Sequence, residues 1–152
     1  MSTGKPPFSL EPHSHSAATG VQRAPTPEPR PSGRERGLQA RWNAYLATLA
    51  QPRGPLTAEH AESVKRFWRH LRSLRSWNLP VPQAGPTEAP GFLLVWDRGR
   101  HHLEIEIYDD GTFDWFYRDR RDESYFGDDG LAPDARPSDL MDRIHLFCNG
   151  SP

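Results

Sequence analysis

Three side chains that commonly bind metal ions alternate along one predicted strand: His102, Glu104 and Glu106. Alternate residues of a strand point to the same side, ~7 Å apart per step, so a metal ion between them is geometrically conceivable. A complete site needs further ligands, and no second cluster elsewhere in the chain supplies them. A solvated polar strand face is the simpler interpretation, and we expect no metal and no other cofactor.

A thiol and an imidazole lie one helical turn apart near the C-terminus, at Cys148 and His145. This spacing could pair a nucleophile with a base, but a helix C-terminus raises the pKa of a thiol, and Cys148 falls on an apolar stripe. The sequence contains no Gly-x-Ser-x-Gly motif, phosphate-binding loop or dinucleotide fingerprint. We therefore expect a packed thiol and no enzymatic activity.

A group of cations without an intervening acidic residue falls on one predicted helix: Lys65, Arg66, Arg69, Arg72 and Arg75. Residues 37–80 carry seven basic and two acidic groups, whereas residues 81–152 carry seven basic and fifteen acidic groups. Such a basic helix could neutralise the phosphates of a nucleic acid. The alternatives are a solvated face or internal balance by the acidic half, because no aromatic platform or recognition motif accompanies the charges.

The strands that position these residues are predicted from period-two alternation at residues 102–108 and 112–118. Between them lies Asp109-Asp110-Gly111, and a three-residue hairpin loop favours glycine at its left-handed third position. Tyr108 then pairs with Thr112. Counting outward sets Ile107, Ile105 and Leu103 opposite Phe113, Trp115 and Tyr117, so that all six apolar side chains share one face.

A third strand is predicted at residues 92–97, where an Arg98-Gly99 turn would pair Leu94 with Leu103 and Phe92 with Ile105. The opposite face of this sheet mixes apolar and acidic side chains. On it we place six candidate partner-binding residues: Leu93, Val95, Glu104, Glu106, Asp114 and Phe116. Glu106 faces Asp114, a like-charge pair that a positive group could relieve. Either a partner protein or the C-terminal helix could cover this face.

The remaining pattern predicts an α+β domain over residues 37–152, preceded by a disordered proline-rich tail over residues 1–36. Helices 38–50 and 58–76 form a helical hairpin, in which Leu38 begins the first apolar stripe and Thr57 caps the second helix.

A short helix over residues 139–147 ends the fold. Residues 124–126 predict a short fourth strand, residues 127–137 a loop, and the prolines between Asn78 and Gly91 an extended connector. The sheet is thus a three- to four-stranded antiparallel meander.

No apolar run approaches the ~20 residues that a membrane-spanning helix needs, and no signal region follows Met1. We expect no membrane partner and a cytoplasmic location.

Several segments together resemble a widespread set of short uncharacterised bacterial proteins. They are Pro86-Thr87, Gly91, the strand ending in Trp96, the Leu-Glu-Ile-Glu strand from Leu103, and Asp110-Gly111. The similarity covers roughly residues 57–127, and the connector from Thr87 to Gly91 is one residue longer here than in that set. No established activity accompanies the resemblance, which implies an antitoxin-like or immunity-like partner of a neighbouring gene product.

We therefore predict a non-catalytic protein-interaction module that contacts an unidentified protein through the six residues named above. Nucleic-acid binding through helix residues 65–75 is the alternative.

Overall fold

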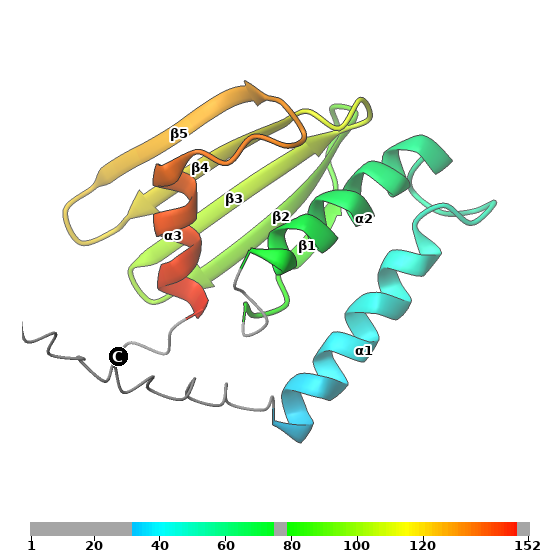
Figure 1. The fold of residues 1–152 in the computed structure, drawn as a ribbon, viewed down its shortest axis with the longest axis horizontal. Helices are drawn as coiled ribbons and strands as arrows, with labels where there is room; N and C mark the ends of the chain where they lie inside the picture. The colour runs from blue at the N-terminus through cyan, green and yellow to red at the C-terminus, as the bar shows by residue number, and fades with distance from the viewer. Residues whose placement is uncertain (1–31, 75–78, 149–152) are drawn as a thin grey trace, which may run out of the picture. The chain divides into compact units, whose positions relative to one another are not determined.

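The computed structural model of this chain describes residues 32–74 and 79–148 (Figure 1). These residues form three helices and one five-stranded antiparallel sheet whose strands are neighbours in chain order. The elements are α1 (Gly33–Thr48), α2 (Ala58–Ser73), β1 (Gln83–Pro86), β2 (Gly91–Arg98), β3 (His101–Tyr108), β4 (Phe113–Asp119), β5 (Ser124–Leu131) and α3 (Ser138–Cys148). The α+β class is confirmed, and the sheet has one strand more than the predicted maximum of four.

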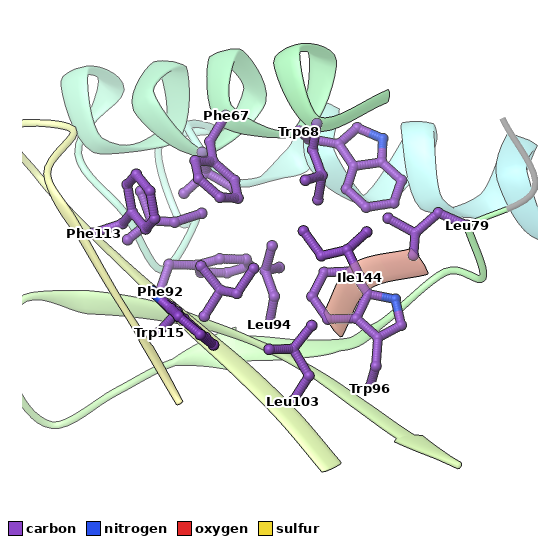
Figure 2. Packing of buried hydrophobic residues seen from close by; sticks show 14 of the residues in the cluster. Phe67, Trp68, Leu79, Phe92, Leu94, Trp96, Leu103, Phe113, Trp115 and Ile144 are labelled. Atoms are coloured by element: carbon purple, nitrogen blue, oxygen red, sulfur yellow. The ribbon is translucent and has the colours of Figure 1, made fainter. Parts of the chain in front are cut away.

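All three helices pack on the same face of the sheet, which we call the inner face (Figure 1). The ring centroids of Phe67 in α2 and Phe113 in β4 are 4.9 Å apart, and Figure 2 shows this contact together with Ile144 of α3. The core-facing residues of the three central strands are all buried: Phe92, Leu94, Trp96, Leu103, Ile105, Ile107, Phe113, Trp115 and Tyr117. We call the opposite side of the sheet the outer face.

The β3–β4 hairpin has the predicted register, with Ile107 opposite Phe113 and Ile105 opposite Trp115. Gly111 has a φ of +85°, and its N–H donates to the carbonyl of Tyr108 at 3.0 Å. Gly111 thus has the left-handed conformation that was predicted for the third position of the loop.

The β2–β3 register differs from the prediction by two residues. Leu94 pairs with Ile105 and Phe92 with Ile107, because the loop consists of Gly99 and Arg100 rather than Arg98 and Gly99. Gly99 has a φ of +57°, as required at the first central position of a type II′ hairpin turn. A shift of two leaves every side chain on its predicted face, since strands alternate with period two.

Strand β1 was predicted only as an extended connector. Its four residues pair with β2, from Gln83 opposite Val95 to Pro86 opposite Phe92. A proline is compatible with this position because β1 is an edge strand, where one side of the backbone needs no ladder partner.

Strand β5 extends to Leu131, although residues 127–131 were predicted as loop. Two aspartate side chains add to the backbone pairing that holds this polar segment to β4, and Leu131 at its end packs against the core. The carboxylate of Asp114 accepts from the N–H of Gly130 at 2.5 Å, and that of Asp128 accepts from the indole N–H of Trp115 at 3.3 Å.

Helix α1 begins at Gly33, five residues earlier than predicted, so residues 33–36 are helical and do not belong to a disordered tail. Leu38 is 42% exposed and lies outside the buried stripe, which Trp42, Leu46 and Leu49 form. The rest of the predicted tail, residues 1–31, lies outside the described residues.

Helix α2 starts after Thr57, whose hydroxyl accepts from the N–H of His60 at 3.2 Å, and this confirms the predicted cap. The helix ends at Ser73 with Leu74 as its C-cap, so the predicted end at residue 76 is wrong; residues 75–78 lie outside the described residues. None of the described helices is long and apolar enough to cross a membrane.

Candidate functional site

All six predicted partner-binding residues lie on the outer face, in two rows across the central strands. One row runs from Leu93 through Glu106 to Asp114, and the other from Val95 through Glu104 to Phe116. Helix α3 lies on the inner face instead, where the guanidinium of Arg143 sits 4.9 Å from the ring of Tyr117. Among the described residues no helix therefore covers the outer face, and the alternative of a covering C-terminal helix is wrong.

Two aromatic rings stand out on this surface. Phe116 is 38% exposed, Tyr125 is 55% exposed, and their ring centroids are 5.7 Å apart. The residue paired with Phe116 on β5 is Gly127, which has no side chain to shield the ring. Tyr125 was not among the predicted residues, because the sequence did not give the orientation of the short strand at residues 124–126 relative to the sheet.

Hydroxyl groups of neighbouring residues reduce the repulsion between the carboxylates of Glu106 and Asp114. The hydroxyl of Tyr108 donates to Asp114 at 2.6 Å, and the hydroxyl of Thr87 lies 2.7 Å from a carboxylate oxygen of Glu106. Hydrogen bonding to Asp114, followed by burial, raises the pKa of Tyr108 well above its ordinary range. The chain itself therefore supplies the compensation that the sequence analysis assigned to an external positive group.

The observed position of the Glu106 carboxylate is possible because residue 91 is glycine. A Cβ there would collide with Oε1 of Glu106, so glycine lets the carboxylate fold back toward Thr87. Thr87, Gly91 and Glu106 are all part of the segments that carry the resemblance described above. The connector and the Leu-Glu-Ile-Glu strand are thus physically joined in this fold.

A second polar network surrounds His102, whose ring nitrogens lie 3.0 Å from Asp97 and 2.8 Å from Glu104. Arg120 makes a bidentate contact with Asp97 at 2.6 and 2.7 Å. The hydrogen bond from Arg120, followed by that from His102, holds the pKa of the Asp97 carboxyl well below its usual range.

These contacts separate the three potential metal ligands of β3. His102 and Glu104 are bonded to each other, whereas Glu106 turns toward Thr87. In the described part of the chain, no group of three histidine, cysteine or acidic side chains is arranged to hold a metal ion.

Cys148 is half-buried at the end of α3, and burial raises the pKa of its thiol to about 11. The thiol is therefore protonated at neutral pH and is a poor nucleophile. His145, the other member of the predicted spacing, is exposed.

The basic side of α2 is partly neutralised within the helix. Glu62 lies 3.4 Å from Lys65 and 2.6 Å from Arg69, two ion pairs that the sequence analysis overlooked. Of the other predicted cations, Arg66 and Arg72 have no acidic partner among the described residues, while Arg75 lies outside them.

No family model, curated protein or solved structure matches this chain. The fold and surfaces described above define a small α+β domain in which all three helices of residues 32–74 and 79–148 cover the same face of an antiparallel sheet. Because a fold of this class does not fix an activity, function is argued from the surfaces themselves.

Proposed function

We propose that this chain is a non-catalytic protein-interaction module of a bacterial cytoplasm that binds a partner protein through the outer face. The partner is the product of a neighbouring gene, and the module acts on it in an antitoxin-like or immunity-like manner. The observation that carries this proposal is the exposed pair of aromatic rings, Phe116 and Tyr125, on a sheet face that no helix of the described residues covers.

The chemistry of the surrounding residues fits a protein interface. Aromatic side chains are enriched in interface cores, and polar rims fix orientation and rate of encounter. Phe116 pairs with the partly exposed Glu104 of β3, and the half-buried Val95 of β2 follows Glu104 in the same row, which would place an apolar ring beside a carboxylate. The proposed partner surface is therefore an apolar patch with a neighbouring cation.

Affinity capture from a lysate of the native cells tests the proposal. The full-length wild-type chain is compared with a Glu104→Lys and Phe116→Ala double variant. Loss of an aromatic anchor and reversal of its flanking charge are expected to weaken a specific partner roughly 30-fold or more. The captured partner must then bind the purified wild-type chain in a two-component titration.

Leu38→Ala provides the matched control, because Leu38 is an exposed apolar residue on α1, away from the outer face. Circular dichroism verifies that both variants are folded. An unchanged set of partners for the double variant, or equal loss with Leu38→Ala, would contradict the proposal.

Nucleic-acid binding through α2 is the second candidate, supported by Arg66 and Arg72, which have no acidic partner in the part of the chain that the structure describes. The test is retention on immobilised DNA at low salt, where phosphate contacts are strongest. Arg69→Glu combined with Arg72→Glu is expected to abolish retention. Arg53→Glu with Arg121→Glu makes the same change in net charge elsewhere, and an equal effect of this control would exclude a specific role for α2.

A further inference from the structure

The helical layer contains an open hollow of about 510 Å³ between α1 and α2. Its walls are formed by Asn43, Trp68, Arg69, Arg72 and Ser73. Since α1 and α2 pack on the inner face, the hollow belongs to the helical side of the domain and is separate from the outer face (Figure 1).

The polar groups at this hollow are mainly unused donors. Arg72 is only partly exposed, yet no acidic side chain of the described residues pairs with it. The amide oxygen of Asn43 accepts from Gln39 at 2.9 Å, which leaves the amide N–H groups of Asn43 to donate. Ser73 and Arg69 are exceptions. The hydroxyl of Ser73 donates to the carbonyl of His70 at 2.7 Å, and the guanidinium of Arg69 donates to Glu62 at 2.6 Å.

A buried donor lies in the same wall. Trp68 is 3% exposed, and its indole Nε1–H has no acceptor. The neighbouring indole of Trp42, whose ring centroid lies 5.2 Å away, also lacks one. Buried donors without an acceptor are uncommon in folded proteins and indicate a missing partner.

The charge of the residues that line the hollow indicates the chemical class of the missing acceptor. No carboxylate is among the lining residues, and the two arginines provide permanent positive charge. An anion that accepts several hydrogen bonds from different directions would satisfy these donors and balance the charge of Arg72. A tetrahedral phosphate does this with three or more oxygens, whereas a planar carboxylate offers two.

We propose that this hollow binds a phosphate group, with Arg72 as the main charged ligand and Asn43 and the Trp68 indole as neutral donors. Arg69, already held by Glu62, lies beside the site and contributes mainly charge. Reaching the covered Nε1 atom requires a neighbouring side chain to move, and exposed side chains at such a site rotate within nanoseconds. The site does not depend on the protein partner of the outer face, and it deepens the second candidate function.

The indole N–H signal of Trp68 in a proton–nitrogen correlation spectrum of the full-length chain reports directly on this site. The chain has five tryptophans, so Trp68→Phe identifies the signal by its disappearance. Titration with inorganic phosphate and with a single-stranded oligonucleotide is expected to shift it in a saturable manner. Arg72→Gln should weaken binding about tenfold or more, as for loss of a charge-assisted hydrogen bond.

Arg53→Gln is the matched control. Arg53 lies in the loop after α1 and does not line the hollow, so this substitution removes the same charge at a distance from the site. Its affinity should stay within about twofold of the wild type. Saturation by both ligands assigns the site to phosphate in general, and saturation by the oligonucleotide alone assigns it to a strand phosphate.

Three outcomes would overturn the proposal: no saturable shift with either ligand, an equal effect of the two arginine variants, or the same shift with polyglutamate. Retention on DNA without movement of the Trp68 signal would leave the second candidate function intact while removing this site.

Discussion

At the tip of the β3–β4 hairpin, Gly111 combines a φ of +85° with a crowded neighbourhood. A Cβ at this position would lie 3.1 Å from Cγ of Pro133. We expect Gly111→Ala to lower the free energy of unfolding by about 1–2 kcal/mol, because an L side chain is strained there. Urea denaturation measures the change.

Gly85→Ala is the control for this substitution. Gly85 lies in β1 without a positive φ, and a Cβ there meets nothing within 4 Å. Its free energy of unfolding should be unchanged or slightly higher. Equal losses at the two glycines would contradict the assigned role of Gly111.

The hydrogen bond from Tyr108 to Asp114 on the outer face makes the free energy of unfolding depend on pH in alkaline solution. Its pKa is raised in the folded chain from an ordinary value of 10.0, since the hydroxyl donates to Asp114 and is partly buried. The stabilisation is therefore fully present below pH 10 and is lost as the pH rises further, because the unfolded chain releases the proton first.

We expect Tyr108→Phe to be less stable than the wild type by about 1 kcal/mol at pH 7. From about pH 10 upward the wild type should lose stability more steeply than the variant, so that the two curves converge. Urea denaturation at pH 7, 10 and 11 measures this. Burial also raises the pKa values of Tyr45 and Tyr117. Both residues are present in the two proteins, so their contributions cancel when the two curves are compared. Parallel curves would show that the Asp114 contact does not govern this titration.

At the scale of elements, one buried hydrogen bond fastens the start of α2 to the sheet. The ring Nε2 of His60 lies 2.8 Å from the carbonyl oxygen of Ile107, and His60 is only 4% exposed. A carbonyl can only accept, so Nε2 carries the hydrogen.

Removal of this donor is expected to weaken the packing of α2 on β3. His60→Leu should lower the free energy of unfolding by about 1–2 kcal/mol. His145→Leu, at an exposed position on α3, should change it by less than about 0.5 kcal/mol. Thermal or urea unfolding measures both, and similar values would mean that the bond contributes no net stability.

The elements at the two edges of the sheet depend on their neighbours more than on their own sequences. β1 contains a proline and two small residues, and β5 contains two glycines and two aspartates, so neither has a strong intrinsic strand pattern. Both become strands through pairing with β2 and β4.

At the scale of the whole molecule, the cations of α2 and a group of carboxylates lie on opposite sides of the sheet. The helices carry the cations of α2, while the outer face carries Glu104, Glu106 and Asp114. The two proposed sites use opposite charges on opposite sides of the sheet. One domain could therefore hold a protein partner and a phosphate-bearing ligand without competition between them.

Among residues 32–74 and 79–148, the buried core residues run from Trp42 to Phe147. A shortened chain that starts at Ser32 is therefore expected to keep its free energy of unfolding within about 0.5 kcal/mol of the full-length value. A chain that starts at Ala50 lacks Trp42, Leu46 and Leu49, and should lose several kcal/mol or fail to fold. Urea denaturation of the three chains compares them, and a large loss in the first would give residues 1–31 a structural role.

Residues close to one another in the sequence were sufficient to predict part of this structure. Gly111 and the alternation around it determined the β3–β4 register and placed Glu104, Glu106 and Phe116 on one face, because a turn and a period of two act between close neighbours. Most boundaries of α2, α3 and the central strands followed for the same reason.

Contacts between distant residues decided the rest. Only the tertiary structure put α3 on the inner face, brought Thr87 and Gly91 to Glu106, and set Asn43 of α1 beside Trp68 and Arg72 of α2. Such arrangements follow from how whole elements share the available apolar surface, which no short stretch of sequence encodes.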